Sequence, residues 1–320
     1  MKVRFGIIGL GQIAARFAEV LNTVEDVELV AVASREKSKA EAFAAKFQAK
    51  KAYDSYEALI KDEEVDVIYV ALTHNFHYEV VKLCLNNKKG VLCEKPFVLT
   101  KNHAEELAAL SKEKNVLLME AMWSRFVPAF KEATQWIKSG KIGAVKMVNA
   151  SFCFNMPFDA ENRLFNPKLA GGSLFDAGVY PIEFTTGILG ENPTKVSGFA
   201  KYSETGVDEF VAMNMSFESG ALANLSCGLS ANTSQDAYVY GTKGHVVVYN
   251  FLGSKKAELY DNENKLVQVF EEDFKDGFIY EIKHFADLYR NNKIESPIIP
   301  LKDTIACAEI FDELMEQFKK

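Results

Sequence analysis

The fold of this chain is decided by residues 3–14, which read VRFGIIGLGQIA. The apolar run over 3–8 predicts a buried parallel strand, and from Gln12 onward apolar residues recur at helical spacing. A strand, a glycine turn and a helix in this order are what a dinucleotide site requires. This segment therefore predicts an α/β Rossmann domain with a doubly wound parallel sheet.

The small residues of the turn each meet a demand of nucleotide binding. Gly9 permits the tight turn, Gly11 lets the backbone approach a pyrophosphate, and Ala14 lets the helix pack closely on the strand. The helix N-terminus at Gln12 and Ile13 offers free N–H groups and a partial positive charge to the phosphates. We therefore assign these five positions to cofactor binding.

The tip of the second strand indicates which dinucleotide is bound. The apolar strand over 27–33 ends at Ser34-Arg35, where an NAD enzyme usually carries a carboxylate for the ribose 2′-hydroxyl. A hydroxyl and a guanidinium instead suit a 2′-phosphate, which Arg binds through two parallel charge-assisted hydrogen bonds. We favour NADP(H) over NAD(H) as the cofactor. The alternative is that Ser34 caps the helix expected over 36–47 and Arg35 is a solvated charge, and both roles can hold together.

Composition and charge exclude several classes of protein. The chain has 320 residues, 48% of them hydrophobic, which is enough for two cores, and its net charge of −7 argues against a nucleic-acid partner. The five cysteines are scattered without a C-x-x-C pair, so buried structural thiols are expected rather than disulfides or a metal site. No signal-peptide pattern occurs, and no stretch approaches the roughly 20 apolar residues of a membrane span. We expect a cytoplasmic protein without a membrane partner.

The rhythm of the elements changes along the chain. Strands and helices alternate up to about Met122, which predicts a Rossmann domain over 1–122. Farther on, apolar and polar residues alternate on both sides of a Ser219-Gly220 turn, which predicts an antiparallel hairpin with one buried face. A second domain over 123–320 is therefore expected to be α+β with an open, mainly antiparallel sheet, and its C-terminal helix (about 300–320) is a candidate to pack back on the first domain. The side chains expected to be buried in the hairpin are Val211, Met213, Met215, Phe217, Ala221, Ala223, Leu225 and Cys227.

Two motifs carry groups that can move a proton. Lys95, in Glu94-Lys95-Pro96, ends an expected buried strand, and the carboxyl ends of such strands face the ligand crevice. Residues 171–180 read GGSLFDAGVY, in which Ser173 is expected to cap a helix that presents Asp176 and Tyr180 on one face. A lysine ammonium near a tyrosine favours phenolate and lowers the tyrosine pKa, so the two suit general acid–base chemistry. Taken singly, each also fits a structural role: a surface ion pair at 94–95, and a core tyrosine behind an aspartate that complements the helix dipole.

Three motifs in this order and spacing resemble those of the glucose–fructose oxidoreductase/inositol dehydrogenase/MocA family: Gly9-Leu10-Gly11, Glu94-Lys95-Pro96 and the segment 171–180. The resemblance covers essentially the whole chain. The segment 120–126, EAMWSRF, and the tyrosine at 180 look most like the branch of dimeric dihydrodiol dehydrogenases and NADP-linked D-xylose dehydrogenases. Many other members of the family carry histidine where this chain has Tyr180.

The resemblance implies roles for individual residues. Lys95 would sit beside the nicotinamide and the substrate hydroxyl, Tyr180 would be the general acid/base, and Asp176 would orient the substrate or tune that pair. His77 would anchor its loop rather than catalyse. The free face of the second sheet would serve self-association, which implies a homodimer or a higher homo-oligomer. The further positions implied are Leu72, Thr73, Asn75, His77 and Glu94 at the cofactor, and Trp123, Arg125 and Phe154 in the wall of the substrate pocket.

These expectations lead to one function and two alternatives. We expect an NADP-dependent dehydrogenase or reductase that transfers hydride between nicotinamide C4 and a hydroxyl-bearing carbon of a small sugar, polyol or dihydrodiol. A non-catalytic NADP(H)-sensing regulator of the same fold would need neither Lys95 nor Tyr180, so the presence of both favours the enzyme. A reductase of another small carbonyl or imine compound stays open, because a fold does not determine the substrate.

Overall fold

The structure is a computed structural model that describes residues 2–319. It divides into two compact units. The first comprises the chain up to Met122 together with Phe278–Ile305, and the second comprises Trp123–Gly277 together with the chain from Ala306 onward. Each unit has its own sheet, and each is described separately below.

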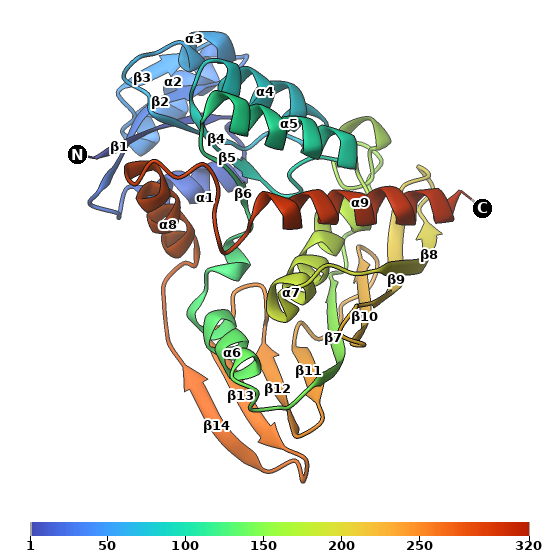
Figure 1. Cartoon of the computed structure of the whole chain (residues 1–320). Coiled ribbons are helices and arrows are strands. Elements are labelled where there is room, and N and C mark those ends of the chain that lie inside the picture. Colours follow the sequence, from blue (N-terminus) through green and yellow to red (C-terminus); the bar gives the residue numbers. More distant parts are fainter. Residues whose placement is uncertain (1, 320) are drawn as a thin grey trace. The chain divides into compact units, whose positions relative to one another are not determined.

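The first unit is built on a fully parallel sheet of six strands in the order β3-β2-β1-β4-β5-β6 (Figure 1). Because β4 lies on the far side of β1 from β2, the strand order reverses between β1 and β4, where doubly wound sheets bind their ligands. This is the predicted Rossmann architecture, so the first half of the predicted fold class is confirmed. The strands are β1 (Val3–Ile8), β2 (Val27–Ala33), β3 (Lys51–Tyr53), β4 (Val67–Val70), β5 (Gly90–Glu94) and β6 (Leu118–Ala121).

Helices connect these strands and cover the sheet. The core beneath them is apolar and aromatic: on α1 the ring of Phe17 stacks on that of Tyr69 in β4, with centroids 3.6 Å apart. The side chains of Thr100 and Ser55 accept hydrogen bonds from His103 and Ala58, so they cap α5 and α3. The helices are α1 (Gln12–Leu21), α2 (Lys37–Phe47), α3 (Tyr56–Ile60), α4 (His77–Asn86), α5 (Lys101–Lys114) and α8 (Phe278–Arg290).

Helix α8 differs from the expected division of the chain, since it was expected in the second domain. Its Phe278 and Phe285 rings lie 6.2 Å from Phe17 and 6.0 Å from Phe5, inside the core of the first unit. An amphipathic helical pattern predicts a buried face but does not say which sheet the helix covers. Residues 301–305, at the start of α9 (Leu301–Phe318), also belong to the first unit.

The second unit is built on a sheet of eight strands in the order β14-β13-β12-β11-β7-β10-β9-β8. Among the strand pairs within residues 2–319, β7 and β10 run parallel and the other neighbours of this sheet run antiparallel. The second half of the predicted fold class is therefore confirmed. The sequence analysis missed β7, which occupies a central place. The strands are β7 (Val145–Cys153), β8 (Lys195–Tyr202), β9 (Asp208–Ser216), β10 (Leu222–Gly228), β11 (Ala237–Gly241), β12 (Gly244–Tyr249), β13 (Lys256–Asp261) and β14 (Leu266–Glu271).

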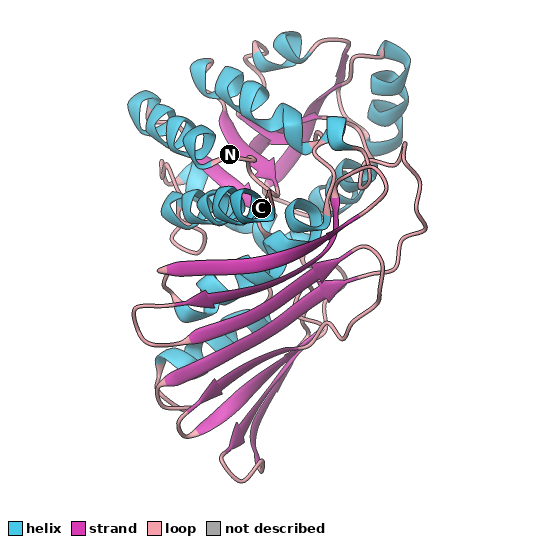
Figure 2. Cartoon of the chain, turned by 90° about the vertical axis from the view of Figure 1, so that its right-hand side faces the viewer, coloured by secondary structure: helices cyan, strands magenta, loops and turns pink. Residues whose placement is uncertain are grey.

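One face of this sheet carries helices and the other is open, and in Figure 2 the open face is turned toward the viewer. Helix α6 (Pro128–Lys138) packs on β12 and β13, and α7 (Val179–Leu189) packs on β7 and β10. The hairpin prediction is confirmed, because β9 pairs with β10 and all eight side chains expected on its inner face are at most 4% exposed. The five cysteines are likewise buried and free, as predicted.

Candidate active site

The glycine turn lies at the carboxyl end of β1, beside the point where the strand order reverses. Gly9 has φ +89°, and a Cβ there would lie 2.4 Å from the carbonyl oxygen of Ala71, the residue that follows β4. Both observations require glycine at this position. The turn therefore stands where open α/β sheets bind nucleotides.

The start of α1 fits a pyrophosphate. Gly11 is the N-cap of α1 and supplies no side-chain cap, so the first N–H groups of the helix are left for a ligand. A Cβ on Gly11 would meet no atom of the described residues within 4 Å, which leaves room for close approach of a phosphate. Ala14 is fully buried against the sheet, whereas Gln12 is exposed. These residues fit a dinucleotide.

The second strand ends in an exposed guanidinium. Arg35 places its Cζ 5.8 Å from the centre of the Phe76 ring, and both side chains are exposed. The expectation that Ser34 caps the next helix is wrong, because α2 begins at Lys37 with Glu36 as its N-cap. Ser34 Oγ instead accepts a hydrogen bond from the Glu36 backbone N–H at 3.2 Å. This side-chain-to-backbone bond closes a local serine turn before the helix.

The loop after β4 is fastened to the loop after β5 by a buried histidine. His77 is fully buried, and its Nε2 lies 3.0 Å from the carbonyl oxygen of Leu72. Its Nδ1 lies 3.0 Å from the carbonyl oxygen of Pro96 and 3.1 Å from that of Phe97. Burial lowers the pKa of His77, and the three carbonyl oxygens around the ring oppose that fall. Nearby, the Thr73 hydroxyl donates to the Asn75 side-chain oxygen at 2.8 Å.

Lys95 follows β5 at the same edge of the sheet as the glycine turn, and its side chain is half-buried. The bond between Lys95 and Pro96 is cis. The carboxyl group of Glu94 is buried and accepts hydrogen bonds from the Tyr69 hydroxyl and from the backbone N–H of Lys95. Burial raises the pKa of Glu94, and the bond from Tyr69 opposes that rise. Glu94 is therefore held in place just before Lys95.

Tyr180 lies in the second unit, near the start of α7. The chain enters α7 through a π-helical turn, Leu174–Gly178, rather than through a regular α-helical turn. The prediction that Ser173 caps this helix is wrong, because its hydroxyl donates to Asp208 on β9 at 2.7 Å. A π-helical turn is often found at functional sites.

Tyr180 is closely packed. Its ring is 8% exposed and meets the Phe152 ring edge-on, with centroids 5.3 Å apart. Apart from Gly187 and Leu189, every residue of α7 is buried, so the helix is enclosed by packing. On the preceding turn, Asp176 forms an ion pair of 2.9 Å with Arg163, whose side chain is half exposed. The arrangement holds a phenol and a carboxylate–guanidinium pair on adjoining turns.

Arg125 lies inside the second unit and is 1% exposed. Its guanidinium pairs with the Glu183 carboxylate at 2.8 Å, and it donates to the Glu183 carbonyl oxygen at 2.8 Å and to Thr186 Oγ1 at 2.6 Å. A Cβ on Gly187 would lie 2.7 Å from Arg125 Nε, so α7 comes very close to this side chain. The Arg125 guanidinium is therefore held by groups of α7. Its place in the wall of the substrate pocket stays a prediction.

The other two residues expected in the pocket wall also have packing partners in the second unit. The Trp123 ring lies against backbone at Gly253 and Gly277, where an added Cβ would meet it at 3.0 and 2.7 Å. Phe154 packs on a small apolar cluster made of Leu164, Phe165, Val207 and Leu229.

The structure adds three residues that the sequence analysis did not single out: Phe152 beside Tyr180, Arg163 on Asp176, and Asp208 beneath Ser173. They come from a strand, a loop and another strand. No local motif marks them, because each owes its place to tertiary packing. By contrast, Gly9, Ser34, Thr73 and Lys95 follow neighbouring parallel strands, so the sequence motifs meet at one edge of one sheet.

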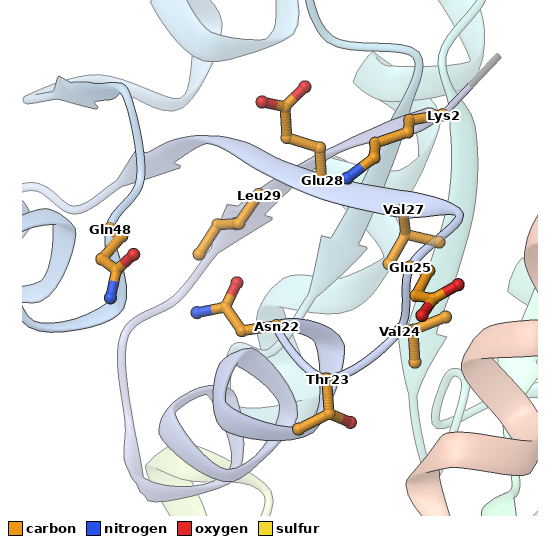
Figure 3. A pocket seen from close by; sticks show the side chains of 9 residues that line it. All are labelled: Lys2, Asn22, Thr23, Val24, Glu25, Val27, Glu28, Leu29 and Gln48. Carbon is orange, nitrogen blue, oxygen red and sulfur yellow. The ribbon is translucent and has the colours of Figure 1, made fainter.

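A separate hollow of about 360 Å³ in the first unit lies at the opposite edge of the sheet (Figure 3). It is formed where β1 and β2 begin and where α1 and α2 end, so it is remote from the carboxyl ends of the strands and from the glycine turn. It does not belong to the candidate nucleotide site. Its lining residues are Lys2, Asn22, Thr23, Val24, Glu25, Val27, Glu28, Leu29 and Gln48.

Comparison with family models identifies both units. A model described as an oxidoreductase family with an NAD-binding Rossmann fold matches residues 3–122, and the GFO/IDH/MocA C-terminal domain matches residues 130–247. Within residues 2–319, no helix is both long enough and apolar enough to cross a membrane.

Individual relatives match over the full length. Trans-1,2-dihydrobenzene-1,2-diol dehydrogenase from Mus musculus is 36% identical, covering 98% of this chain and 96% of its own, and that from Homo sapiens is 34% identical with the same coverage. Among solved structures, aldose-aldose oxidoreductase from Caulobacter crescentus superposes with a TM-score of 0.91 at 23% identity, covering 100% of this chain and 98% of that one. The 3-ketoreductase KijD10 from Actinomadura kijaniata, in complex with NADP and TDP-benzene, gives a TM-score of 0.89 at 23% identity, covering 99% and 98%.

Proposed function

Because the chain belongs to the GFO/IDH/MocA oxidoreductase family, we propose that it is an NADP-dependent dehydrogenase acting on a hydroxyl-bearing carbon of a small sugar, polyol or dihydrodiol. The observation that carries the proposal is the common position of Gly9, Gly11 and Lys95 at the carboxyl edge of the parallel sheet. A phosphate cradle and a lysine ammonium then serve one cofactor. The full-length identity to dihydrodiol dehydrogenases supports a substrate of the CH–OH class.

In the proposed reaction Tyr180 is the general acid/base. Its phenolate takes the proton of the substrate hydroxyl, and the hydride on the same carbon goes to nicotinamide C4, so that the C–OH group becomes a C=O group. We propose that the Lys95 ammonium assists by favouring the phenolate form of Tyr180, because a positive charge stabilises a phenolate anion. Reduction of the carbonyl runs through the same steps in reverse. Asp176, held by Arg163 at 2.9 Å, orients the substrate.

The proposal is tested by incubating the purified protein with NADP⁺ or NAD⁺ and a panel of aldoses, polyols and dihydrodiols, following fluorescence of the reduced cofactor. We expect turnover with NADP⁺ on members of the panel. A protein that binds NADPH and turns over none of them, in either direction, would instead be a sensor of the cofactor.

Replacing Arg35 with Ala is expected to weaken NADPH binding by about 10–100-fold and to leave NADH binding unchanged. A hydrogen bond to a charged group contributes about 1.5–3 kcal/mol, and about 1.4 kcal/mol corresponds to a tenfold change in affinity. The guanidinium is exposed beside the Phe76 ring, so it is accessible to a 2′-phosphate. Fluorescence titration with each reduced cofactor measures both affinities.

The matched control is Lys46→Ala, which removes a positive charge from the last turn of α2. It should change neither affinity. Tighter binding of NADH than NADPH by the unaltered protein would reject Arg35 as the 2′-phosphate ligand.

We further propose that two copies of the chain associate through the open face of the second sheet. Phe199, Leu222 and Met147 on this face are 85%, 56% and 39% exposed. Leu222 lies directly across from Met147, and Met147 lies across from Tyr240, which begins an aromatic row through His245 and Tyr260. Leu222, Met147 and this row are neighbours across the strands, while Phe199 stands on the edge strand β8, and neighbouring exposed apolar side chains are typical of an interface between proteins.

Replacing Leu222 with Glu is expected to convert a dimer into a monomer, because it places an unpaired charge among apolar side chains. Sedimentation velocity measures the state, and Ala45→Glu on α2, an exposed residue of the first unit, is the control for an added charge. A monomeric wild-type protein, or a Leu222→Glu variant that remains dimeric, would contradict this interface.

A further inference from the structure

Asp208, the first residue of β9, braces the turn that leads to Tyr180. It is 3% exposed, and its Oδ2 accepts hydrogen bonds from the Ser173 hydroxyl at 2.7 Å and from the Leu174 backbone N–H at 2.6 Å. Both donors stand at the beginning of the π-helical turn Leu174–Gly178. The carboxylate therefore takes the place that a helix cap would otherwise have.

The turn is shaped around this carboxylate. Gly172 has φ +123°, and a Cβ there would lie 2.3 Å from Asp208 Oδ1. The Gly172 backbone N–H donates to the Leu164 carbonyl oxygen at 2.9 Å, and its carbonyl oxygen accepts from the Asp176 N–H at 3.3 Å. The glycine is thus needed both for its conformation and for the close approach of Asp208. A change at Asp208 acts directly on the turn that carries Asp176.

Tyr180 follows two residues after the π-helical turn, on the enclosed helix α7. We propose that Asp208 is a positioning residue for the reaction at Tyr180: by fixing Gly172, Ser173 and Leu174 it sets where Asp176 and Tyr180 stand. This inference rests on the proposed role of Tyr180 as acid/base. A displacement of about 1 Å at a reacting group is enough to cost roughly 10²-fold in rate.

Ionisation of the buried Asp208 carboxyl group lowers the free energy of unfolding. Burial raises the pKa of Asp208 from 3.8 to about 6, and the bonds from Ser173 and Leu174 oppose the rise. An acid whose pKa is raised on folding stabilises the fold fully below its unfolded pKa, and that contribution is lost as the pH rises through about 6. At neutral pH the carboxylate therefore lowers the free energy of unfolding, as expected of a group kept for activity.

With the pKa of Asp208 raised to about 6, the groups that face it matter near that pH. Cys227 on β10 and Tyr202 on β8 are neutral there, because the pKa of each is raised above its ordinary value. Two further carboxylates of this unit form ion pairs, Asp176 with Arg163 and Glu209, the neighbour of Asp208, with Lys201.

The test compares Asp208→Asn with the wild-type protein. We expect kcat to fall by about 10–10²-fold with the NADPH affinity unchanged, and the fall in wild-type kcat below about pH 6 to disappear in the variant. The melting temperature at pH 8 should stay the same or rise. Ser173→Ala, which removes one of the two donors, should lower kcat less and keep the pH limb. Asp261→Asn is the control, since its carboxylate accepts from the Glu263 and Lys265 N–H groups in a hairpin turn.

Two outcomes overturn the inference. One is an Asp208→Asn variant with wild-type kcat and an unchanged pH limb, and the other is a variant that loses melting temperature and activity together, which is a structural effect alone. Tyr180→Phe separates this result from the proposed function. If that variant is active, the assignment of Tyr180 fails, whereas an inactive Tyr180→Phe beside an active Asp208→Asn rejects the positioning role.

Discussion

Replacing Tyr180 with Phe is expected to lower kcat by about 10²–10⁴-fold, the usual contribution of a positioned acid or base. The substitution removes the hydroxyl and keeps the ring that meets Phe152 edge-on at 5.3 Å, so the packing of α7 is retained. NADPH affinity should be unchanged, because the residues assigned to the cofactor belong to the other unit. Steady-state kinetics with the best substrate of the panel and a fluorescence titration with NADPH measure the two quantities.

Tyr238→Phe is the matched control, because it removes a hydroxyl from β11 on the open face of the sheet. It should leave kcat unchanged. A Tyr180→Phe variant with near-normal turnover would falsify the assignment of Tyr180 as acid/base. It would direct attention to the Asp176–Arg163 pair as the remaining proton-transfer group on these turns.

Removal of the Arg125 side chain is expected to destabilise the second unit by about 3–5 kcal/mol, because Glu183 would be left as an uncompensated buried charge. The two side chains are 1% and 0% exposed, and their ion pair is 2.8 Å long. In a unit of this size each kcal/mol lowers the melting temperature by about 2–4 °C. Calorimetry of Arg125→Ala should therefore show the transition of the second unit at a much lower temperature.

Two further variants identify the cause. Replacing both partners, as Arg125→Met with Glu183→Leu, should recover most of the lost stability, because apolar side chains of similar size remove the unpaired charge. Lys255→Ala breaks an exposed pair with Asp273, and it should change the free energy of unfolding by less than about 1 kcal/mol. If Arg125→Ala has normal stability and a raised KM for substrate, the result would contradict the structural role and support the predicted place of Arg125 in the wall of the substrate pocket.

Local periodicity explains which parts of the fold were predictable. The strand, turn and helix over 3–14 and the hairpin around Ser219-Gly220 follow from patterns a few residues long, and both are confirmed. Strand β7 was missed because its burial does not alternate cleanly: Val148, Ala150 and Cys153 are buried, while its other residues are exposed or half-buried. Its partner β10 lies about 70 residues farther along the chain, so nothing nearby signals the pairing.

The candidate site divides in the same way. Gly9, Arg35 and Lys95 follow predicted strands, and the parallel sheet brings them to one edge as expected. The start of α7 was predicted with ordinary helical spacing, whereas the structure has a π-helical turn over Leu174–Gly178, so Asp176 and Tyr180 are not related by one regular turn. That turn depends on Asp208, which enters from a strand about 35 residues later, and a pattern confined to one segment cannot contain it.

The return of α8 to the first unit has a consequence for the order in which the chain acquires its structure during synthesis. Phe278 and Phe285 complete the core around Phe17 and Phe5, so the first unit lacks part of its interior until the ribosome has synthesised α8. The nascent chain up to Met122 therefore keeps part of its apolar surface uncovered while residues 123–277 are synthesised. The second unit in turn includes the chain from Ala306 onward, which is synthesised after α8, so neither unit has all of its residues before the other is nearly finished.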